Sequence, residues 1–187
     1  MSHSLGEVEA LARKAARGGG YSWGMAEEAG FAVRWLCAHG LDGCGALALL
    51  LDSGAGACPL AAGTGFADDV ARFAQAAELG ELNAPLLLLP FVAQAAGRLG
   101  GTLTLTAAQV TAVTNGQHTE LSAPMPARAA VTITRGGRIK TPLPTTTRAT
   151  PDASVWQKLT TYAARTYAPE SEVSRLSGAG AGLTDND

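Results

Sequence analysis

The pattern of apolar residues changes at Gly100-Gly101, and this change constrains the fold more than any other feature of the sequence. Before it, apolar residues recur every three or four positions, which is typical of amphipathic helices. After it, "TLTLT" and "VTAV" alternate in period two, which is typical of half-buried strands. Helices followed by a run of neighbouring strands indicate an α+β fold with segregated elements, rather than alternating βαβ units.

The N-terminal part carries clear signals for the starts and ends of helices. Ser4 and Glu7 have the S-x-x-E form of a capping box, and the triplet Gly18–Gly20 ends the helix that follows. Ser22 is the expected N-cap of a second helix, which Gly40 ends. Further helices are expected over 43–52, about 67–79 and about 90–99, with a short buried strand at 86–89 as an open alternative.

Residues 102–143 predict about four short antiparallel strands. Asn115-Gly116 is a strong turn signal because both residues tolerate positive φ. Gly136-Gly137 lies between "AAVTITR" and "RIKTPL", which predicts a second hairpin. A last helix is expected after Asp152 or Ser154. We therefore expect a single domain over 1–187: a helical part at 1–100, a strand meander at 102–143, and a helix with a glycine-rich tail at 152–187.

Composition argues against several classes of protein. The 14 basic and 16 acidic residues nearly cancel, so the chain has no basic field for nucleic acid. The longest apolar runs are shorter than the ~20 residues that span a bilayer, and the first residues are too polar for a signal peptide. Three cysteines without regular spacing do not make a disulfide framework. We expect a cytoplasmic protein with reduced thiols and no membrane contact.

No cofactor or metal is predicted. No G-x-G-x-x-G motif joins a strand to a helix, which argues against a doubly wound dinucleotide fold. The histidines are scattered, and no Cys or His pair has the spacing of metal ligands. Asp68-Asp69 and the pair Asp185 and Asp187 could supply oxygen ligands to magnesium or calcium, but no D-x-D-x-D-G loop is present and solvated carboxylates are the preferred interpretation.

Two stretches resemble a family of proteins. The element "GYSWGMAEEAG" near the start and the ending "TYAPESEVSRLSGAGAGLTDND" are similar to motifs of an uncharacterised bacterial family, a domain of unknown function. The similarity extends to "CPLAAG" and "PLLLLPF" and therefore covers the whole chain. The resemblance implies a small cytoplasmic protein and brings no established activity with it.

The first candidate site is the segment from Gly18 to Glu28. Its glycines let the backbone approach a ligand, Tyr21 and Trp23 could cover that ligand, and free N–H groups near Gly24 would favour an anion. Glu27 and Glu28 would repel an anion, so they fit acid/base catalysis or amine binding better. The structural alternative is an interhelical loop whose aromatic side chains fill the core and whose glutamates complement the helix dipole.

Cys58 is a second candidate. A cysteine before proline in a glycine-rich loop could be a nucleophile if its pKa were lowered, with His39 or His118 near in space as a base. The alternative is a small buried apolar residue, which is the usual state of a free cysteine. Cys37 lies on the apolar side of a helix, so we expect it in the core.

The tail "SGAGAGLTDND" is the third candidate. Gly178, Gly180 and Gly182 could present N–H groups to an anion, whereas Asp185 and Asp187 add negative charge at the far end. Such a loop suits a zwitterionic or amine-bearing ligand, or docking onto the protein's own arginines. The composition by itself would be called a frayed end.

Three functions remain open. The first is a protein that binds a small polar metabolite, whether or not it is also an enzyme or an enzyme subunit. Its pocket would be formed by Tyr21, Trp23, Glu27 and Glu28. Arg175 and the tail glycines would close it. The second hypothesis is an accessory or structural subunit whose tail docks into a protein partner or another copy of the chain. The third is a cysteine-dependent enzyme that uses Cys58.

Overall fold

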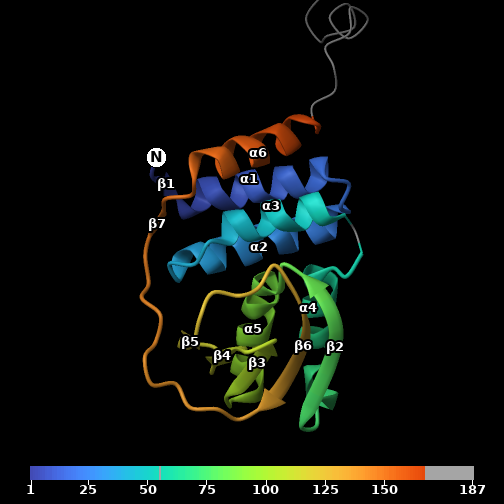
Figure 1. Ribbon diagram of the computed structural model, residues 1–187, viewed down its shortest axis with the longest axis vertical. Coiled ribbons are helices and arrows are strands. Elements are labelled where there is room, and N and C mark those ends of the chain that lie inside the picture. Colours follow the sequence, from blue (N-terminus) through green and yellow to red (C-terminus); the bar gives the residue numbers. More distant parts are fainter. Residues whose placement is uncertain (55, 167–187) are drawn as a thin grey trace, which may run out of the picture.

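The computed structural model describes residues 1–54 and 56–166, which form a helical layer and a sheet layer (Figure 1). An extended segment after β6 (Arg128–Arg135) runs along one side of the molecule from the sheet layer to the last helix (Figure 1). The helical layer contains α1 (Leu5–Gly18), α2 (Trp23–Ala38), α3 (Gly43–Ser53) and α6 (Ala153–Ala164). The sheet layer contains α4 (Pro59–Asp68), α5 (Leu89–Leu99) and the main sheet.

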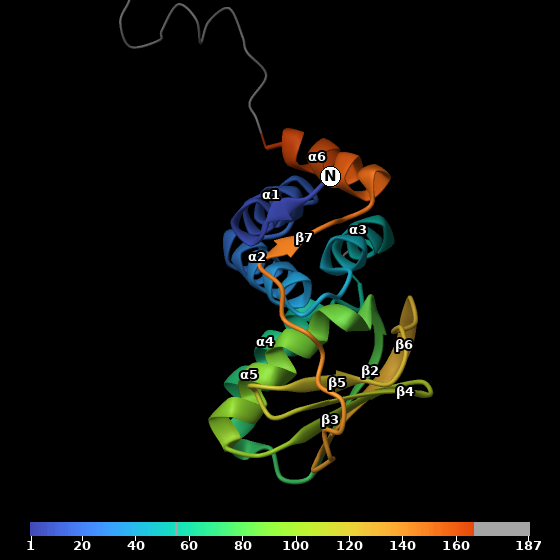
Figure 2. The same cartoon turned by 90° about the vertical axis from the view of Figure 1, so that its left-hand side faces the viewer.

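The main sheet is antiparallel throughout and has the strand order β2-β6-β3-β4-β5. Helices α4 and α5 lie on one side of it (Figure 2). A separate two-stranded ladder pairs β1 (His3–Ser4) with β7 (Arg148–Ala149). The strands of the main sheet are β2 (Ala76–Asn83), β3 (Leu103–Ala107), β4 (Val110–Thr114), β5 (Thr119–Leu121) and β6 (Arg128–Arg135). The expected combination of helices and an antiparallel sheet is confirmed, but the sheet has five strands where about four were expected.

Local capping explains where the first helices begin. The Ser4 hydroxyl accepts from the Glu7 N–H, and the Glu7 carboxylate accepts from the Ser4 N–H at 2.7 Å, so the predicted capping box is confirmed. Ser22 caps α2, as predicted. The Asp42 carboxylate caps α3 by accepting from the Gly45 N–H at 2.8 Å. Gly40 has φ +70°, the left-handed conformation expected beyond the end of α2.

The helix expected over 67–79 is wrong. Helix α4 ends at Asp68, a 3-10 turn η1 (Val70–Arg72) follows, and the chain then extends into β2, the edge strand that pairs with β6. Gly80, with φ +69°, lies at the irregularity in this pairing. The alanine-rich sequence favours a helix locally, and pairing with a strand 50 residues further on overrides that preference. Residues 85–88 form the 3-10 turn η2 (Pro85–Leu88), not a strand.

The second hairpin predicted at Gly136-Gly137 is also wrong. Strand β6 pairs with β2 on one side and with β3 on the other, so neither side of it is open to residues 138–143. That segment runs instead beside β5, where the Leu143 N–H donates to the Thr119 carbonyl at 2.7 Å. The predicted Asn115-Gly116 hairpin is confirmed, because this turn joins β4 to β5.

The buried side chains form two adjoining clusters. One is centred on α1, α2, α3 and α6, and it is rich in alanine and leucine. The other lies between α5 and the sheet, with Leu103, Leu105 and Ile133 fully buried. Phe91 of α5 belongs to the helical cluster, and Leu88 just before α5 belongs to the sheet cluster. The start of α5 therefore lies where the helical layer meets the sheet layer.

Candidate functional site

A polar cavity of about 590 Å³ lies between α2, α4 and α5, within the range of small-ligand sites. We call it the acidic pocket, because carboxylates from three helices reach it. Its lining residues are Glu9, Gly24, Met25, Glu27, Glu28, Phe31, Thr64, Ala67, Asp68, Phe91, Gln94 and Arg98.

Helical periodicity explains why these residues share one cavity. Residues three, four or seven positions apart lie on the same face of a helix. Helix α2 contributes Gly24, Glu28 and Phe31, which are spaced in this way. Helix α4 contributes Thr64 and Asp68 at a four-residue step, and α5 contributes residues 91, 94 and 98. Each helix therefore turns one polar stripe with an aromatic or small residue toward the same space.

Close contacts between helices fix the floor of the pocket. The rings of Phe31 and Phe91 meet edge to face, with centroids 5.6 Å apart. Gly63 of α4 allows this arrangement, because a Cβ there would lie 2.4 Å from Cδ2 of Phe91. Gly30 similarly lets α2 approach the backbone of Glu9 in α1. The two rings therefore make an apolar, closely packed floor.

The carboxylates differ in whether they have a partner. Glu27 accepts from Arg13 at 2.9 Å, and Glu9 accepts from Arg34 at 2.6 Å, so α1 and α2 exchange ion pairs at the rim. Glu28 is half-buried and makes no hydrogen bond or ion pair with the described residues. Burial, followed by the charges of Asp68 and Glu27, raises the pKa of Glu28 above its ordinary value. Glu28 is thus the carboxylate that would gain most from a bound cation.

Helix α5 contributes two groups to the lining that suit an anion. The Arg98 guanidinium donates to the Ala67 carbonyl at 2.9 Å, which ties α5 to the last turn of α4. Arginine carries five N–H donors, and this bond uses one of them. Gln94 lies one turn earlier on the same face of α5. The lining of the pocket therefore combines carboxylates with a guanidinium and an amide.

The structure separates the predicted aromatic residues from the predicted glutamates. Gly24, Glu27 and Glu28 line the acidic pocket, whereas Tyr21 and Trp23 do not. Tyr21 is half-buried against the helical cluster, and burial together with Cys58 raises its pKa. The indole of Trp23 is 69% exposed and lies 4.5 Å from the Arg17 guanidinium, centroid to Cζ. The rings of Tyr21 and Trp23 therefore do not cover the acidic pocket.

Cys58 is the N-cap residue of α4 and is half-buried. Its thiol lies 3.9 Å from the Tyr21 hydroxyl, its hydrogen-bond partner among the described residues. Neither histidine considered as a base hydrogen-bonds to it in the described part of the chain: His39 stacks on Trp35, and His118 is exposed near the end of the β4–β5 turn. A nucleophilic role for Cys58 stays a prediction without a base beside it.

The remaining predicted residues, Arg175, Gly178, Gly180, Gly182, Asp185 and Asp187, lie outside the described residues. The sequence reasoning did not identify Asp68, Gln94 and Arg98 as one site, although Asp68 was considered as a metal ligand. Asp69, its neighbour, turns away from the pocket and pairs with Arg72 at 3.4 Å. The i, i+3 and i+7 spacing of Phe91, Gln94 and Arg98 in "FVAQAAGR" was the signal that could have placed α5 at the site.

Comparison with known proteins adds a family. Residues 3–72, which contain α1 to α4, match the model of a family described as protein of unknown function (DUF3726). No curated protein and no solved structure matches the chain. None of the helices within 1–54 and 56–166 combines the length and the apolar character needed to cross a membrane. The similarity to an uncharacterised family predicted from the sequence is thus confirmed for residues 3–72, which match the DUF3726 family.

Proposed function

We propose that this protein binds a small polar metabolite that carries an amine, and that the acidic pocket is the binding site. The observation that carries the proposal is the pair Glu28 and Asp68. These carboxylates come from different helices, line one cavity, and make no ion pair with a lysine or arginine of the described residues. Arg98 lines the same cavity, but its guanidinium bonds the Ala67 carbonyl and forms no ion pair with either carboxylate, so these like charges favour a cation that arrives with the ligand.

The volume of the acidic pocket and the hydrogen-bond donors of Arg98 and Gln94 narrow the class of ligand. A cavity of about 590 Å³ accommodates a molecule the size of an amino acid or a diamine. The phenylalanine floor would contact its carbon chain. Arg98 and Gln94 supply donors for a carboxylate at the other end, so an amino acid with a cationic side chain fits better than a simple diamine.

The raised pKa of Glu28 gives the proposal a thermodynamic signature. A bound ammonium group favours the ionised carboxylate and lowers that pKa, so binding releases part of a proton. Affinity should therefore increase as the pH rises through the pKa of Glu28 in the free protein. A ligand that contacts only the rim would not show this dependence.

The test is a thermal-shift and calorimetry series on the full chain with L-lysine, L-arginine, putrescine and succinate as probes. Ligand at about 100 times its Kd stabilises the folded state by about 2.7 kcal/mol, which a melting curve resolves. We expect stabilisation by the cationic amino acids, less by putrescine and none by succinate. Glu28→Gln and Asp68→Asn should weaken binding.

The matched control is Asp69→Asn, one residue from Asp68 but directed to Arg72 outside the pocket. It should leave binding unchanged. If no probe stabilises the protein, or if Asp69→Asn weakens binding as much as Asp68→Asn, the proposal is wrong. Stabilisation by succinate alone would instead identify Arg98 as the main determinant and would also contradict it.

A further inference from the structure

A second chemical group lies away from the acidic pocket, where α2 ends and α3 begins. Cys37, in the last turn of α2, and Cys44, in the first turn of α3, are hydrogen-bonded to each other through their side chains. Their exposed fractions are 5% and 1%. Both are free thiols, and the sequence reasoning placed Cys37 in the core without recognising its partner.

The glycines around Cys44 explain this contact. A Cβ on Gly43 would lie 2.8 Å from the Val33 carbonyl oxygen, so only glycine lets the start of α3 press against α2 here. A Cβ on Gly45 would lie 2.1 Å from Oδ2 of Asp42, so glycine also makes room for the carboxylate that caps α3. The N-terminus of α3 is thereby held against the sulfur of Cys37.

The two thiols have different environments. The side-chain hydrogen bond from Cys44, together with backbone N–H groups of Gly43 and Cys44, lowers the pKa of Cys37 despite burial and the nearby Asp42 charge. The pKa of Cys44 is raised, first by the same hydrogen bond and then by burial. Of the two thiols, Cys37 therefore ionises more readily than Cys44.

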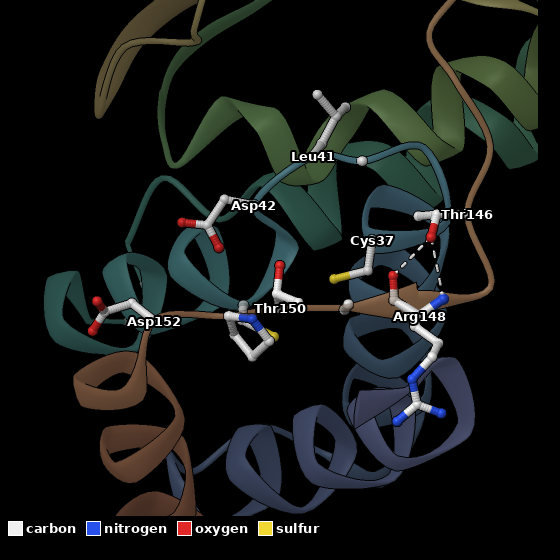
Figure 3. A pocket seen from close by; sticks show the side chains of 11 residues that line it. Cys37, Leu41, Asp42, Thr146, Arg148, Thr150 and Asp152 are labelled. Atoms are coloured by element: carbon white, nitrogen blue, oxygen red, sulfur yellow. Dashed lines mark hydrogen bonds between the residues drawn. The ribbon is translucent and has the colours of Figure 1, made fainter. Parts of the chain in front are cut away.

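A cavity of about 500 Å³ gives access to this pair (Figure 3). We call it the thiol pocket. It lies between the α2–α3 turn and the extended segment 146–152, and both cysteines line it. Figure 3 shows the Cys37 side chain directed toward Thr150, whereas the Arg148 guanidinium points away from it. Arg148 is held in place by bonds from its guanidinium to the hydroxyl and carbonyl of Ser2, at 2.8 and 2.9 Å.

We propose that Cys37 and Cys44 form a peroxide-reactive dithiol site, with Cys37 as the nucleophile and Cys44 as the resolving thiol. Asp42, Thr150 and Arg148 give the pocket polar groups for a hydroperoxide, and a cysteine that is only 5% exposed is reached more easily by a small oxidant than by a bulky disulfide. This site is independent of the acidic pocket, because the two cavities share no lining residue.

The reaction balances in two steps. The Cys37 thiolate attacks one oxygen of the hydroperoxide, an S–O bond forms as the O–O bond breaks, and the leaving alkoxide or hydroxide takes a proton from water. The Cys44 sulfur then attacks the sulfur of the resulting sulfenic acid, and the displaced hydroxyl leaves as water with the Cys44 proton. Two thiols and one hydroperoxide become a disulfide, an alcohol or water, and water.

The experiment treats the fully reduced chain with hydrogen peroxide, alkylates the remaining thiols and identifies the products by peptide mass spectrometry. We expect a Cys37–Cys44 disulfide that dithiothreitol reverses, with Cys58 still alkylated. Cys44→Ser should stop at a sulfenic acid on Cys37, which dimedone traps. Cys37→Ser should lose disulfide formation, and Cys58→Ser should form the disulfide as the unmodified protein does.

Three results would overturn the proposal. They are oxidation of Cys58 before Cys37, a dimedone adduct on Cys58 but not Cys37 in Cys44→Ser, and equal rates of thiol loss in Cys37→Ser and the unmodified chain. Circular dichroism checks that each variant is folded. If Cys37→Ser does not fold, the dimedone result in Cys44→Ser decides alone, because it locates the nucleophile without altering Cys37.

Discussion

Gly18 of α1 lies directly against the backbone of Tyr162 in α6. A Cβ at position 18 would be 1.7 Å from the Tyr162 carbonyl oxygen. No side chain can occupy that space, so glycine sets how closely the first and last helices approach. This contact packs the C-terminal helix onto the helical layer from the far end of the sequence, together with the fully buried Leu159.

Gly18→Ala should therefore destabilise the protein. The new methyl group meets a backbone atom, which cannot rotate away, so α1 and α6 must separate. Overpacking of this kind costs about 1–3 kcal/mol, and denaturant unfolding measures it directly.

Gly6→Ala is the matched control, because Gly6 lies in the same helix and a Cβ there meets nothing within 4 Å. It should change the free energy of unfolding by less than about 1 kcal/mol, in the stabilising direction, because alanine is the better helix former. If both variants lose the same stability, the close approach of α1 and α6 does not contribute as described.

Structural features that depend on a few neighbouring residues were predicted correctly from the sequence. They are the Ser4–Glu7 capping box, the Ser22 cap and the Asn115-Gly116 turn. These features depend on side chain and backbone groups within one turn, so the local sequence specifies them.

Features that depend on a distant partner were missed. Strand β2 exists because β6 accepts it as a neighbour, and nothing within "AAELGELN" distinguishes it from a helix. Glu27 and Glu28 were identified as site residues by type, but Asp68 and Arg98 join them through the packing of α4 and α5 on α2. The pairing of Cys37 with Cys44 similarly requires the close approach that Gly43 allows.

The electrostatics of the acidic pocket predict a stability change in Glu28→Gln. Because the pKa of Glu28 is raised on folding, its ionised form opposes folding, and this cost grows as the pH rises above the ordinary value of 4.5. The glutamine variant should be more stable at neutral pH and melt at a higher temperature; the gain in free energy of unfolding should be less than about 1 kcal/mol, since the group is partly exposed.

The difference should disappear below pH 4.5, where the carboxyl of the unmodified protein is protonated in both states. Melting curves from acid to neutral pH, without ligand, measure it. A glutamine variant that is less stable at neutral pH would show that Glu28 has a favourable partner, against the geometry described above.

For Asp52 we expect the opposite pH dependence of the free energy of unfolding. Its carboxylate accepts from the Lys158 ammonium at 2.6 Å and from the Tyr162 hydroxyl at 3.1 Å, so it links α3 to α6. The bond from Lys158 is the main reason why the pKa of Asp52 is lowered.

A lowered carboxyl pKa contributes stability above the ordinary value of 3.8, and this contribution is lost as the pH falls through the folded value. Asp52→Asn should therefore cost stability at neutral pH and little at strongly acidic pH. The loss should be small and should shrink with added salt, because the group is largely exposed. A loss that does not depend on salt would indicate packing rather than charge.

The Glu120 side chain holds the extended segment that follows β6, at residues 140 and 141. One oxygen of its carboxylate accepts from the N–H groups of Lys140 and Thr141, the second at 2.8 Å, and this lowers the pKa of Glu120. The Glu120 side chain therefore holds this segment at the sheet edge by hydrogen bonds that backbone carbonyls would accept in a regular ladder.

Glu120→Ala removes the acceptor and leaves both N–H groups to water. Hydrogen exchange of these two amides should accelerate, while that of Leu143, which donates to the Thr119 carbonyl, changes less.

The control is Glu81→Ala on β2, at the opposite edge of the same sheet, where the carboxylate pairs with Arg128 at 2.7 Å. It removes a glutamate of the same sheet but no bond to residues 138–143, so exchange at Lys140 and Thr141 should stay as in the unmodified chain. Equal acceleration in both variants would mean that the sheet as a whole had loosened. Acceleration confined to Glu120→Ala would show that one carboxylate directs the path from the sheet to β7, and thus to the wall of the thiol pocket.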